Sequence, residues 1–473
     1  MAASLPDKND ADGSGTRAPR NRYADLLRAL AICLVVLGHW LLTSISYRGG
    51  RLSGVSAMDA ISWSGWGTLV FQVIPVFFLV GGYANALSWT QHRASGATWA
   101  AWVRHRAIRL LRPTSVYVAV AAGAVAAARL AGANAVELAQ AGWAVAMQLW
   151  FLPVYLLLIA LTPALHAAHR RCGLVVPAMM ALGAAGVDAC LLGARLSAVG
   201  YANYLLVWGS MHQWGFAWRD GTLTRQRWRP YALAASGIVT LAGLLAWSPF
   251  PVNMVGTTTG GVNNTIPPSV ALLAFAAAQA GLLLAAEPVM SRLLARARLW
   301  RLVTWLNNRV LTVYLWHMIP VVVAAVALYP SGILAQPAIG SAGWWALRPL
   351  WIASLAIILA PAAIWLARFE RPLVRRPASA SRPASPAGLG FVLVAAGVAA
   401  AGVALARITI SGFAPAGQVP AGAVAGYACG VMLTLLAGRL AGAGRADRAD
   451  RAGPGGRAGP GGRAGPSRVE RLA

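Results

Sequence analysis

Residues 24–46 read ADLLRALAICLVVLGHWLLTSIS, an apolar run long enough to cross a bilayer. Three ionisable residues interrupt it: Asp25, Arg28 and His39. An ionisable side chain at bilayer depth costs roughly 2.5–3.5 kcal/mol and is retained mainly where it faces a polar interior. In a helix, Arg28 and His39 lie within roughly 20° of the same face, and Asp25 lies within about 60° of both. The pattern predicts a polar stripe on a membrane helix, with His39 roughly 16 Å further along the axis than Arg28.

The composition is typical of a polytopic membrane protein. Of the 473 residues, 58% are hydrophobic and 11% are charged, and the mean hydropathy is +0.60. A soluble chain of this length is less apolar. We therefore expect an all-α fold with a ten-helix core and two further C-terminal transmembrane helices. The twelve candidate spans are about 24–46, 67–90, 113–133, 147–167, 173–193, 200–218, 230–248, 267–286, 302–328, 348–367, 388–408 and 419–440.

The distribution of arginine predicts the topology, because the only lysine is Lys8. If the N-terminus is cytoplasmic, the inner segments carry most of the arginines between the spans, and the positive-inside rule then places both termini in the cytoplasm and the chain in the cell membrane. The net charge of +27 thus mainly reflects topology. Since it is dispersed over many loops without a binding module, no nucleic-acid partner is expected. The inner arginines are Arg93, Arg104, Arg106, Arg109, Arg112, Arg170, Arg171, Arg219, Arg225, Arg227, Arg229, Arg292, Arg296, Arg298, Arg301, Arg368, Arg371, Arg375, Arg376 and Arg382, against Arg48, Arg51, Arg129, Arg195, Arg348 and Arg407 outside.

The composition also divides the chain into segments. We expect a disordered cytoplasmic N-terminus (1–21), a membrane domain (22–376), a linker (377–387), two extra transmembrane helices (388–440) and a disordered basic tail (441–473). The basic tail suits contact with anionic membrane lipid. The four cysteines lie in or beside apolar spans without metal or redox spacing, so we interpret them as small buried residues and predict neither a disulfide nor a metal site.

The second predicted helix contains a proline and a glycine pair. Residues 74–83 read IPVFFLVGGY, which indicates a kinked helix in which Gly81 and Gly82 precede Tyr83. Paired glycines allow close approach either of another helix or of a ligand. The sequence leaves both interpretations open.

Three arginines follow at helical spacing on the inner side. Arg106, Arg109 and Arg112 stand at i, i+3 and i+6, so they lie along one broad side of a helix. Guanidinium groups bind phosphate bidentately, and three of them at the cytoplasmic mouth suit a phosphate-bearing substrate. Anchoring to lipid headgroups is the alternative.

Further polar residues lie in separate spans. Tyr314 and His317 occur in the ninth predicted helix, with His317 near mid-membrane, and His212 occurs in the sixth. His317 is either a hydrogen-bonded interior histidine or part of a polar site. Polar groups in several spans predict a hydrophilic cavity that serves either a reaction or a passage.

Five short motifs occur in order along the first ten predicted spans and the segment that follows them, and together they resemble acyltransferase family 3. This family of polytopic membrane proteins O-acylates surface polysaccharides, peptidoglycan, glycolipids and some antibiotics. Gly81 stands where the family pattern has serine. The motifs are Asp25-Leu-Leu-Arg28 with His39, Phe77-Phe78-Leu-Val-Gly81-Gly82-Tyr83, Arg106-Ala-Ile-Arg109, Tyr314-Leu-Trp-His317 and Phe369-Glu370-Arg371-Pro372.

The resemblance implies a membrane O-acyltransferase. Its donor would be cytoplasmic acyl-CoA, acetyl-CoA in the first place, used as a substrate and not as a bound cofactor. Its acceptor would be a hydroxyl of a glycan, glycolipid or natural product. His39 would be the general base or proton relay, and Arg28 would hold the donor or stabilise the oxyanion. Asp25 would orient Arg28 or the neighbouring basic groups. The arginines Arg106, Arg109 and Arg112 would bind the donor phosphates, and the candidates for lining the cavity are Gly81, Gly82, Tyr83, His212, Tyr314 and His317.

Two features depart from parts of the family. Trp150-Phe151-Leu152 stands where some members have a W-S-L-x-x-E segment, so a role for that glutamate is not carried over. Two apolar spans follow the core in place of a periplasmic hydrolase-like domain. Transfer to an acceptor that reaches the membrane is therefore favoured over delivery to a distant polymer.

Two rival functions use the same residues differently. A transporter or exporter of an anionic small molecule or glycan precursor would use the polar stripe as a path. The sequence has no apparent inverted repeat or pair of broken helices, which disfavours this reading. A scaffold for an envelope-synthesis complex would leave the polar stripe unexplained.

Overall fold

The computed structural model describes residues 21–194, 196–256, 261–370 and 387–451. The predictions for residues 1–20, 377–386 and 452–473 lie outside this range, as do the last two residues of the Phe369–Pro372 motif. The elements are α1 (Arg22–Leu42), β1 (Thr43–Arg48), β2 (Arg51–Ser56), α2 (Ala57–Ala60), α3 (Ser64–Phe71), α4 (Ile74–Ala94), α5 (Trp99–Leu130), α6 (Ala135–Ala144), η1 (Met147–Trp150), α7 (Phe151–Cys172), α8 (Val175–Ala194), η2 (Ser197–Tyr201), α9 (Ala202–Arg219), α10 (Trp228–Trp247), α11 (Val270–Leu293), α12 (Ala297–Asn307), α13 (Val310–Trp316), α14 (Ile319–Leu328), α15 (Ala342–Glu370), α16 (Ala387–Ser411), η3 (Pro415–Gly417) and α17 (Ala421–Arg451).

The predicted class, an all-α polytopic membrane protein, is confirmed. Within the described residues, ten helices are long and apolar enough to cross a membrane, or eleven if the bent pair α13–α14 is one span. The sixth predicted span, 200–218, corresponds to α9 and is the one that does not reach that apolarity. α9 is nevertheless the most enclosed of these helices, because thirteen of its 18 residues are buried. Its surroundings are protein rather than lipid, so its polar side chains are tolerated.

Several predicted boundaries were wrong. The span 24–46 ends at Leu42, and the arginine-rich inner segment is the first half of the continuous helix α5, which begins at Trp99. The span 302–328 divides into α12, α13 and α14, with a bend of 43° between the last two. Pro320 accounts for this break, because its ring displaces the carbonyl four residues earlier. The cysteines Cys33, Cys172, Cys190 and Cys429 are free and exposed, not buried as expected, so they lie on the outer faces of the helices.

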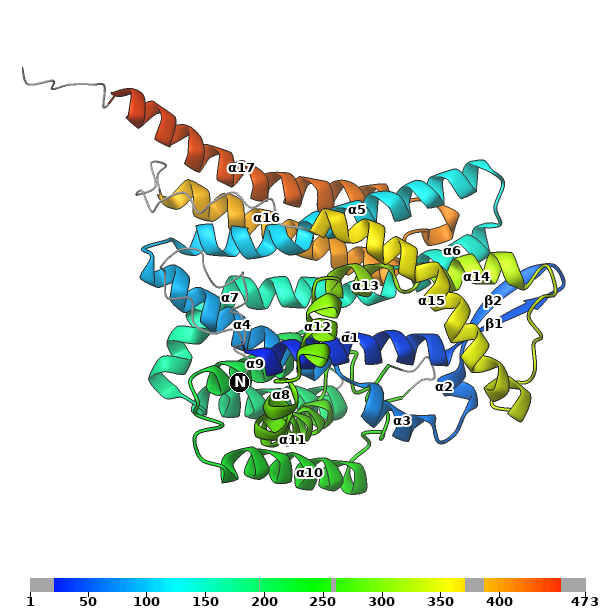
Figure 1. Cartoon of the computed structure of the whole chain (residues 1–473), viewed down its shortest axis with the longest axis horizontal. Helices are drawn as coiled ribbons and strands as arrows, with labels where there is room; N and C mark the ends of the chain where they lie inside the picture. The colour runs from blue at the N-terminus through cyan, green and yellow to red at the C-terminus, as the bar shows by residue number, and fades with distance from the viewer. Residues whose placement is uncertain (1–20, 195, 257–260, 371–386, 452–473) are drawn as a thin grey trace, which may run out of the picture.

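Helix α1 lies at the centre of the bundle (Figure 1). It contacts α3, α4, α11, α12, α13 and α15. Its start is fixed by Asn21, whose side chain accepts a hydrogen bond from the backbone amide of Ala24. A helix enclosed in this way can carry ionisable groups through the bundle out of contact with lipid.

A short hairpin follows α1, which the sequence analysis did not anticipate. Strands β1 and β2 are antiparallel, and the turn between them contains Gly49 and Gly50, both with positive φ. Two consecutive residues with positive φ match the twist of a two-residue hairpin, and glycine adopts them without strain. In Figure 1 the hairpin lies at the right-hand end of the bundle, beside α14 and the start of α15.

The C-terminal helices α16 and α17 pack against each other and against α5, and α16 also contacts α7. Figure 1 shows them along the top of the bundle beside α5. The Tyr427 hydroxyl of α17 donates to the carbonyl of Leu111 on α5 over 2.9 Å. The two helices beyond the core are therefore part of the same packed body.

Helices α4 and α9 pack with their backbones in direct contact. A Cβ atom at Gly82 would lie 2.0 Å from the carbonyl oxygen of His212, and one at Gly215 would lie 2.2 Å from that of Leu79. Gly82 therefore serves helix packing, one of the two interpretations left open by the sequence.

This contact predicts the effect of Gly82→Ala. The added methyl group meets backbone, which cannot rotate away, so we expect a loss of about 1–3 kcal/mol of stability. Thermal unfolding of the purified protein in detergent measures it. Gly123→Ala on α5 is the matched control, because a Cβ there meets nothing within 4 Å. Equal melting temperatures for the two variants would show that α4 and α9 are not in close contact.

The arginine bias predicts the orientation of the bundle. In a background without the four native cysteines, we expect Ala94→Cys, at the end of α4, to be protected from an impermeant thiol reagent in intact cells. Ile333→Cys, between α14 and α15, should be labelled. The reverse pattern would invert the topology and with it the side from which a donor is taken.

Candidate active site

Two histidines from different helices meet inside the bundle. The Nδ1 atom of His39 on α1 lies 3.3 Å from the Nε2 atom of His317, which follows α13. Their rings are 5.0 Å apart between centroids and inclined at 60°. The polar stripe of α1 therefore meets the histidine at the break between α13 and α14.

The break between α13 and α14 positions His317. A broken helix in a membrane protein leaves carbonyl groups that need donors from elsewhere. Tyr314 O lies 2.8 Å from Nδ1 of His317, Leu315 O accepts from Gln148 Nε2 over 3.1 Å, and His317 O accepts from Trp40 Nε1 over 2.7 Å. Three carbonyl groups at the break are thus paired with side chains.

These contacts define the tautomers of both histidines. A carbonyl oxygen can only accept, so Nδ1 of His317 carries a proton and donates to Tyr314 O. His317 is 0% exposed and has no acidic partner among the described residues, which favours neutral imidazole. Its Nε2 is then an acceptor, and Nδ1 of His39 must donate to it. The remaining lone pair of His39 is on Nε2, for which the described residues offer no hydrogen-bond partner.

The stripe on α1 opens at two depths. Arg28 and His39 are both partly exposed, while Ile32 and Val35 between them on the same side of the helix are 2% and 7% exposed. The eleven residues from Arg28 to His39 correspond to roughly 16 Å along the helix. A single arginine side chain does not bridge that distance, so the guanidinium of Arg28 does not reach the imidazole of His39.

A cluster of positive charge surrounds Arg28. Its Nη1 atom lies 3.3 Å from Oδ1 of Asp25, the pairing that the sequence predicted. The guanidinium of Arg109 on α5 interacts electrostatically with those of Arg106 and Arg28. We call these three arginines the cationic cluster. Like charges in a partly desolvated site repel one another unless an anion binds between them.

Asn85 of α4, which sequence reasoning did not single out, connects this cluster to α9. Arg106 donates from Nη2 to Oδ1 of Asn85, and Nδ2 of Asn85 lies 3.0 Å from Nε2 of His212. Because the amide oxygen is engaged by Arg106, the amide nitrogen must donate to His212. Both Asn85 and His212 are 0% exposed. His212 thus belongs to the support of Arg106 and is not next to His39.

The other predicted site residues lie around these two groups. Arg112 is exposed on α5. A Cβ at Gly81 would lie 2.7 Å from the Tyr155 ring, so Gly81 leaves room for an aromatic side chain that also interacts with Arg109. Tyr83 packs on Trp218, with centroids 4.6 Å apart.

Gln148 is a second residue that the sequence reasoning missed. It is 3% exposed, and its Nε2, which carries two protons, lies 2.9 Å from the Tyr117 hydroxyl, 2.9 Å from the carbonyl oxygen of Val145 and 3.1 Å from that of Leu315. The backbone carbonyl of Gln148 accepts a hydrogen bond from the hydroxyl of Tyr314. Tyr314 therefore fixes η1, the turn before α7, against the α13 break instead of presenting a free hydroxyl.

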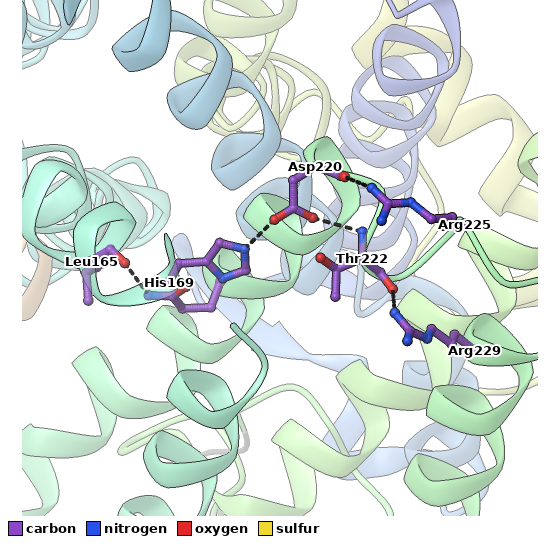
Figure 2. A network of polar contacts seen from close by, with 7 residues as sticks. Leu165, His169, Asp220, Thr222, Arg225 and Arg229 are labelled. Atoms are coloured by element: carbon purple, nitrogen blue, oxygen red, sulfur yellow. Dashed lines mark hydrogen bonds and ion pairs between the residues drawn. The ribbon is translucent and has the colours of Figure 1, made fainter. Parts of the chain in front are cut away.

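A further polar network joins the end of α7 to the turn after α9 (Figure 2). Nε2 of His169 lies 2.8 Å from Oδ2 of Asp220, and the amide of Thr222 donates to Oδ1 over 2.8 Å. Burial raises the pKa of Asp220, but hydrogen bonds from Thr222 and His169 outweigh it, so this pKa lies below its usual value. The carbonyls of Asp220 and Thr222 accept from Arg225 and Arg229. The network secures a helix end and is separate from the histidine pair.

Among the described residues, no three His, Cys, Asp or Glu side chains converge as a metal site requires. Fold and site together define a polytopic membrane protein with a cationic cluster at one depth and an oriented histidine at another.

Residues 21–369 match the family model described as an acyltransferase domain, that of acyltransferase family 3. The chain belongs to this family and is a membrane acyltransferase. No curated protein and no solved structure matches it. Membership implies an acyl donor and an acceptor.

Proposed function

We propose that this acyltransferase moves an acyl group, acetyl in the first instance, from cytoplasmic acyl-CoA to a hydroxyl of an envelope-associated glycan or glycolipid. The observation that carries the proposal is the free Nε2 lone pair of His39, oriented by His317. The arrangement has the logic of catalytic histidines generally, in which a second group fixes the tautomer so that one nitrogen is available as base.

The cationic cluster supports a donor that carries phosphates. Arg28, Arg106 and Arg109 come from two helices, and the charge of Arg109 interacts with those of the other two. Guanidinium forks pair bidentately with phosphate oxygens. Asn85 holds Arg106 in place before the donor arrives, which lowers the cost of ordering that side chain on binding.

The difference in depth between Arg28 and His39 fits the shape of acyl-CoA. Its phosphates and its thioester are separated by a long, extended pantetheine arm. With the phosphates at the cationic cluster, an extended arm would have the length to bring the thioester to His39. Arg28 would then hold the donor, and of the two roles proposed for it, oxyanion stabilisation next to His39 is disfavoured by the roughly 16 Å along α1.

The reaction balances with these groups alone. Nε2 of His39 accepts the proton of the acceptor hydroxyl as its oxygen bonds to the acyl carbon. The carbon–sulfur bond breaks, and the departing CoA thiolate takes up the proton from His39. His317 acts as a positioning residue throughout.

The rival function is export of an anionic small molecule or glycan precursor. Within the part of the chain that the structure describes, one candidate span is broken, α13–α14, a feature also found in transporters. Transporter sites usually pair two such breaks in related halves. Here the carbonyls at the break already accept hydrogen bonds from side chains of the protein. This favours a fixed structural role for the break in catalysis over a role as an ion path.

His39→Ala tests the catalytic step. We expect a folded, inserted protein that still binds acyl-CoA but transfers acyl groups at least ~100-fold more slowly, because loss of a general base has that scale. Mass spectrometry of labelled acceptor and of released CoA measures the rate. Normal transfer by His39→Ala across pH 6 to 8 would refute this mechanism.

Variants of His317 test the positioning role within the same assay. His317→Phe should lower kcat by roughly 10–100-fold, the scale of losing a partner that orients a histidine, with the donor KM unchanged. His317→Gln keeps an acceptor for Nδ1 of His39 and should recover part of that loss. A merely structural role for His317 predicts no such difference between variants of equal stability.

Arg106→Lys and Asn85→Leu test the donor site. Lysine at position 106 keeps the positive charge but lacks the forked guanidinium group. Leucine at position 85 removes the amide that holds this guanidinium. Both variants should therefore weaken acyl-CoA binding about 10-fold or more. Equilibrium binding in nanodiscs measures this. Arg170→Lys is the matched control, because Arg170 is exposed at the end of α7 and lies outside the cluster. Unchanged affinity in both site variants would assign the arginines to lipid anchoring.

A further inference from the structure

A cavity of about 340 Å³ lies at the hairpin end of the bundle. It is enclosed by the start of β1, the segment between α14 and α15, and the first turns of α15, which meet at the right-hand end of Figure 1. We call it the hairpin pocket. Its volume is at the lower end of the range for small-molecule sites.

Arg348 of α15 is the principal charged group of the hairpin pocket. It is 6% exposed, and its guanidinium lies 4.1 Å from the ring centroid of Trp344 and 5.9 Å from that of Trp351. Nη1 donates to the carbonyl of Thr43, while Nε is buried without a hydrogen-bond partner. Among the described residues Arg348 has no ion pair. A buried guanidinium with an unused donor and no counter-ion is a site for an anion.

The rest of the lining has no acidic residue, and a few polar side chains lie among apolar ones such as Leu334, Ile339 and Leu347. Ser44, Ser46 and Gln336 contribute hydroxyl and amide groups, and Arg48 adds a second positive charge on the exposed hairpin. Such groups pair with the hydroxyls of a sugar, and the two arginines select a sugar that carries an anion.

The hairpin pocket is also linked to the histidine pair. Trp351 in its wall donates from Nε1 to the carbonyl of Trp40, and Trp40 donates from Nε1 to the carbonyl of His317. Ser44 follows His39 by five residues on the same chain segment. A molecule in the pocket is therefore next to the end of α1 that carries His39, opposite the cationic cluster.

We propose that the hairpin pocket binds an anionic carbohydrate, with its carboxylate or phosphate on Arg348 and its hydroxyls on Ser44, Ser46 and Gln336. The proposal deepens the proposed function by naming the acceptor class. Only the role of this carbohydrate as the acyl acceptor rests on the proposed function, because its binding does not depend on acyl transfer.

Direct binding tests the pocket. The probes are glucuronate, glucose 6-phosphate and neutral glucose, added without donor to the full chain in phosphatidylcholine nanodiscs and followed by saturation-transfer NMR. We expect saturable binding of at least one of the two anionic sugars and none of glucose. The anionic sugar that binds distinguishes a carboxylate from a phosphate ligand. Equal binding of glucose, or no binding of either anionic sugar, would overturn the proposal.

Two variants localise the binding. Arg348→Met removes the charge and should lower affinity at least ~10-fold. Ala335→Trp fills the exposed mouth and leaves the bond from Arg348 to Thr43 intact, so it should abolish binding even if Arg348→Met fails to fold. Arg51→Met is the control, because Arg51 is exposed on the same hairpin outside the pocket lining. Binding that survives Ala335→Trp places the sugar elsewhere and overturns the proposal.

Lipid is the competing source of an anion. If adding phosphatidylglycerol to the nanodisc does not displace the bound sugar, the pocket is a carbohydrate site. If no free sugar binds and the variants change only the binding of phosphatidylglycerol, the pocket is a lipid-headgroup site and the proposal fails. Anionic sugar binding without cleavage of acyl-CoA would leave the pocket intact and refute the catalytic proposal. His39-dependent cleavage of acyl-CoA without sugar binding would support the catalytic proposal and refute the hairpin pocket as a sugar site.

Discussion

The break between α13 and α14 requires donors for carbonyl groups at membrane depth, and the arrangement around it follows from satisfying them. Water is scarce there, so an unpaired carbonyl costs several kcal/mol. His317, Gln148 and Trp40 supply the donors. Because the Nδ1 proton of His317 is donated to the Tyr314 carbonyl, Nε2 of His317 is an acceptor. The proton of His39 must therefore be on Nδ1, from which it is donated to His317. The backbone defect thereby determines which nitrogen of His39 is left as a base.

The sequence predicted several of the residues in this arrangement, but not which of them contact one another. Asp25, Arg28 and His39 could be placed on one face because helical periodicity is fixed, and the Asp25–Arg28 contact follows from i, i+3 spacing. That His39 meets His317 depends on how two helices pack, which periodicity does not specify. Asn85 and Gln148 were missed because a single amide in an apolar span has no pattern around it. The Gly49–Gly50 turn of the hairpin did have a sequence signal, since paired glycines between two arginines favour a two-residue turn.

Helix α9 shows why hydropathy alone undercounts such spans. Its polar residues would be costly against lipid, but α4, α7, α8 and α11 contact it. Gly82 and Gly215 bring the α4 and α9 backbones together, and the same contact places His212 where Asn85 can reach it. Close packing by glycine and the support of Arg106 are therefore two results of one helix crossing.

The helices beyond the core act on the same side of the molecule as the cationic cluster. α5 carries Arg106 and Arg109, and its neighbours include α16 and α17. The Tyr427 hydroxyl satisfies the carbonyl of Leu111, which lies two residues after Arg109. Pro113 follows in the same helix, and the carbonyl that it leaves without a helical donor is that of Arg109, four residues earlier. The bond from Tyr427 ties α17 to the part of α5 that carries Arg109, which gives the C-terminal helices a structural reason to accompany the acyltransferase core.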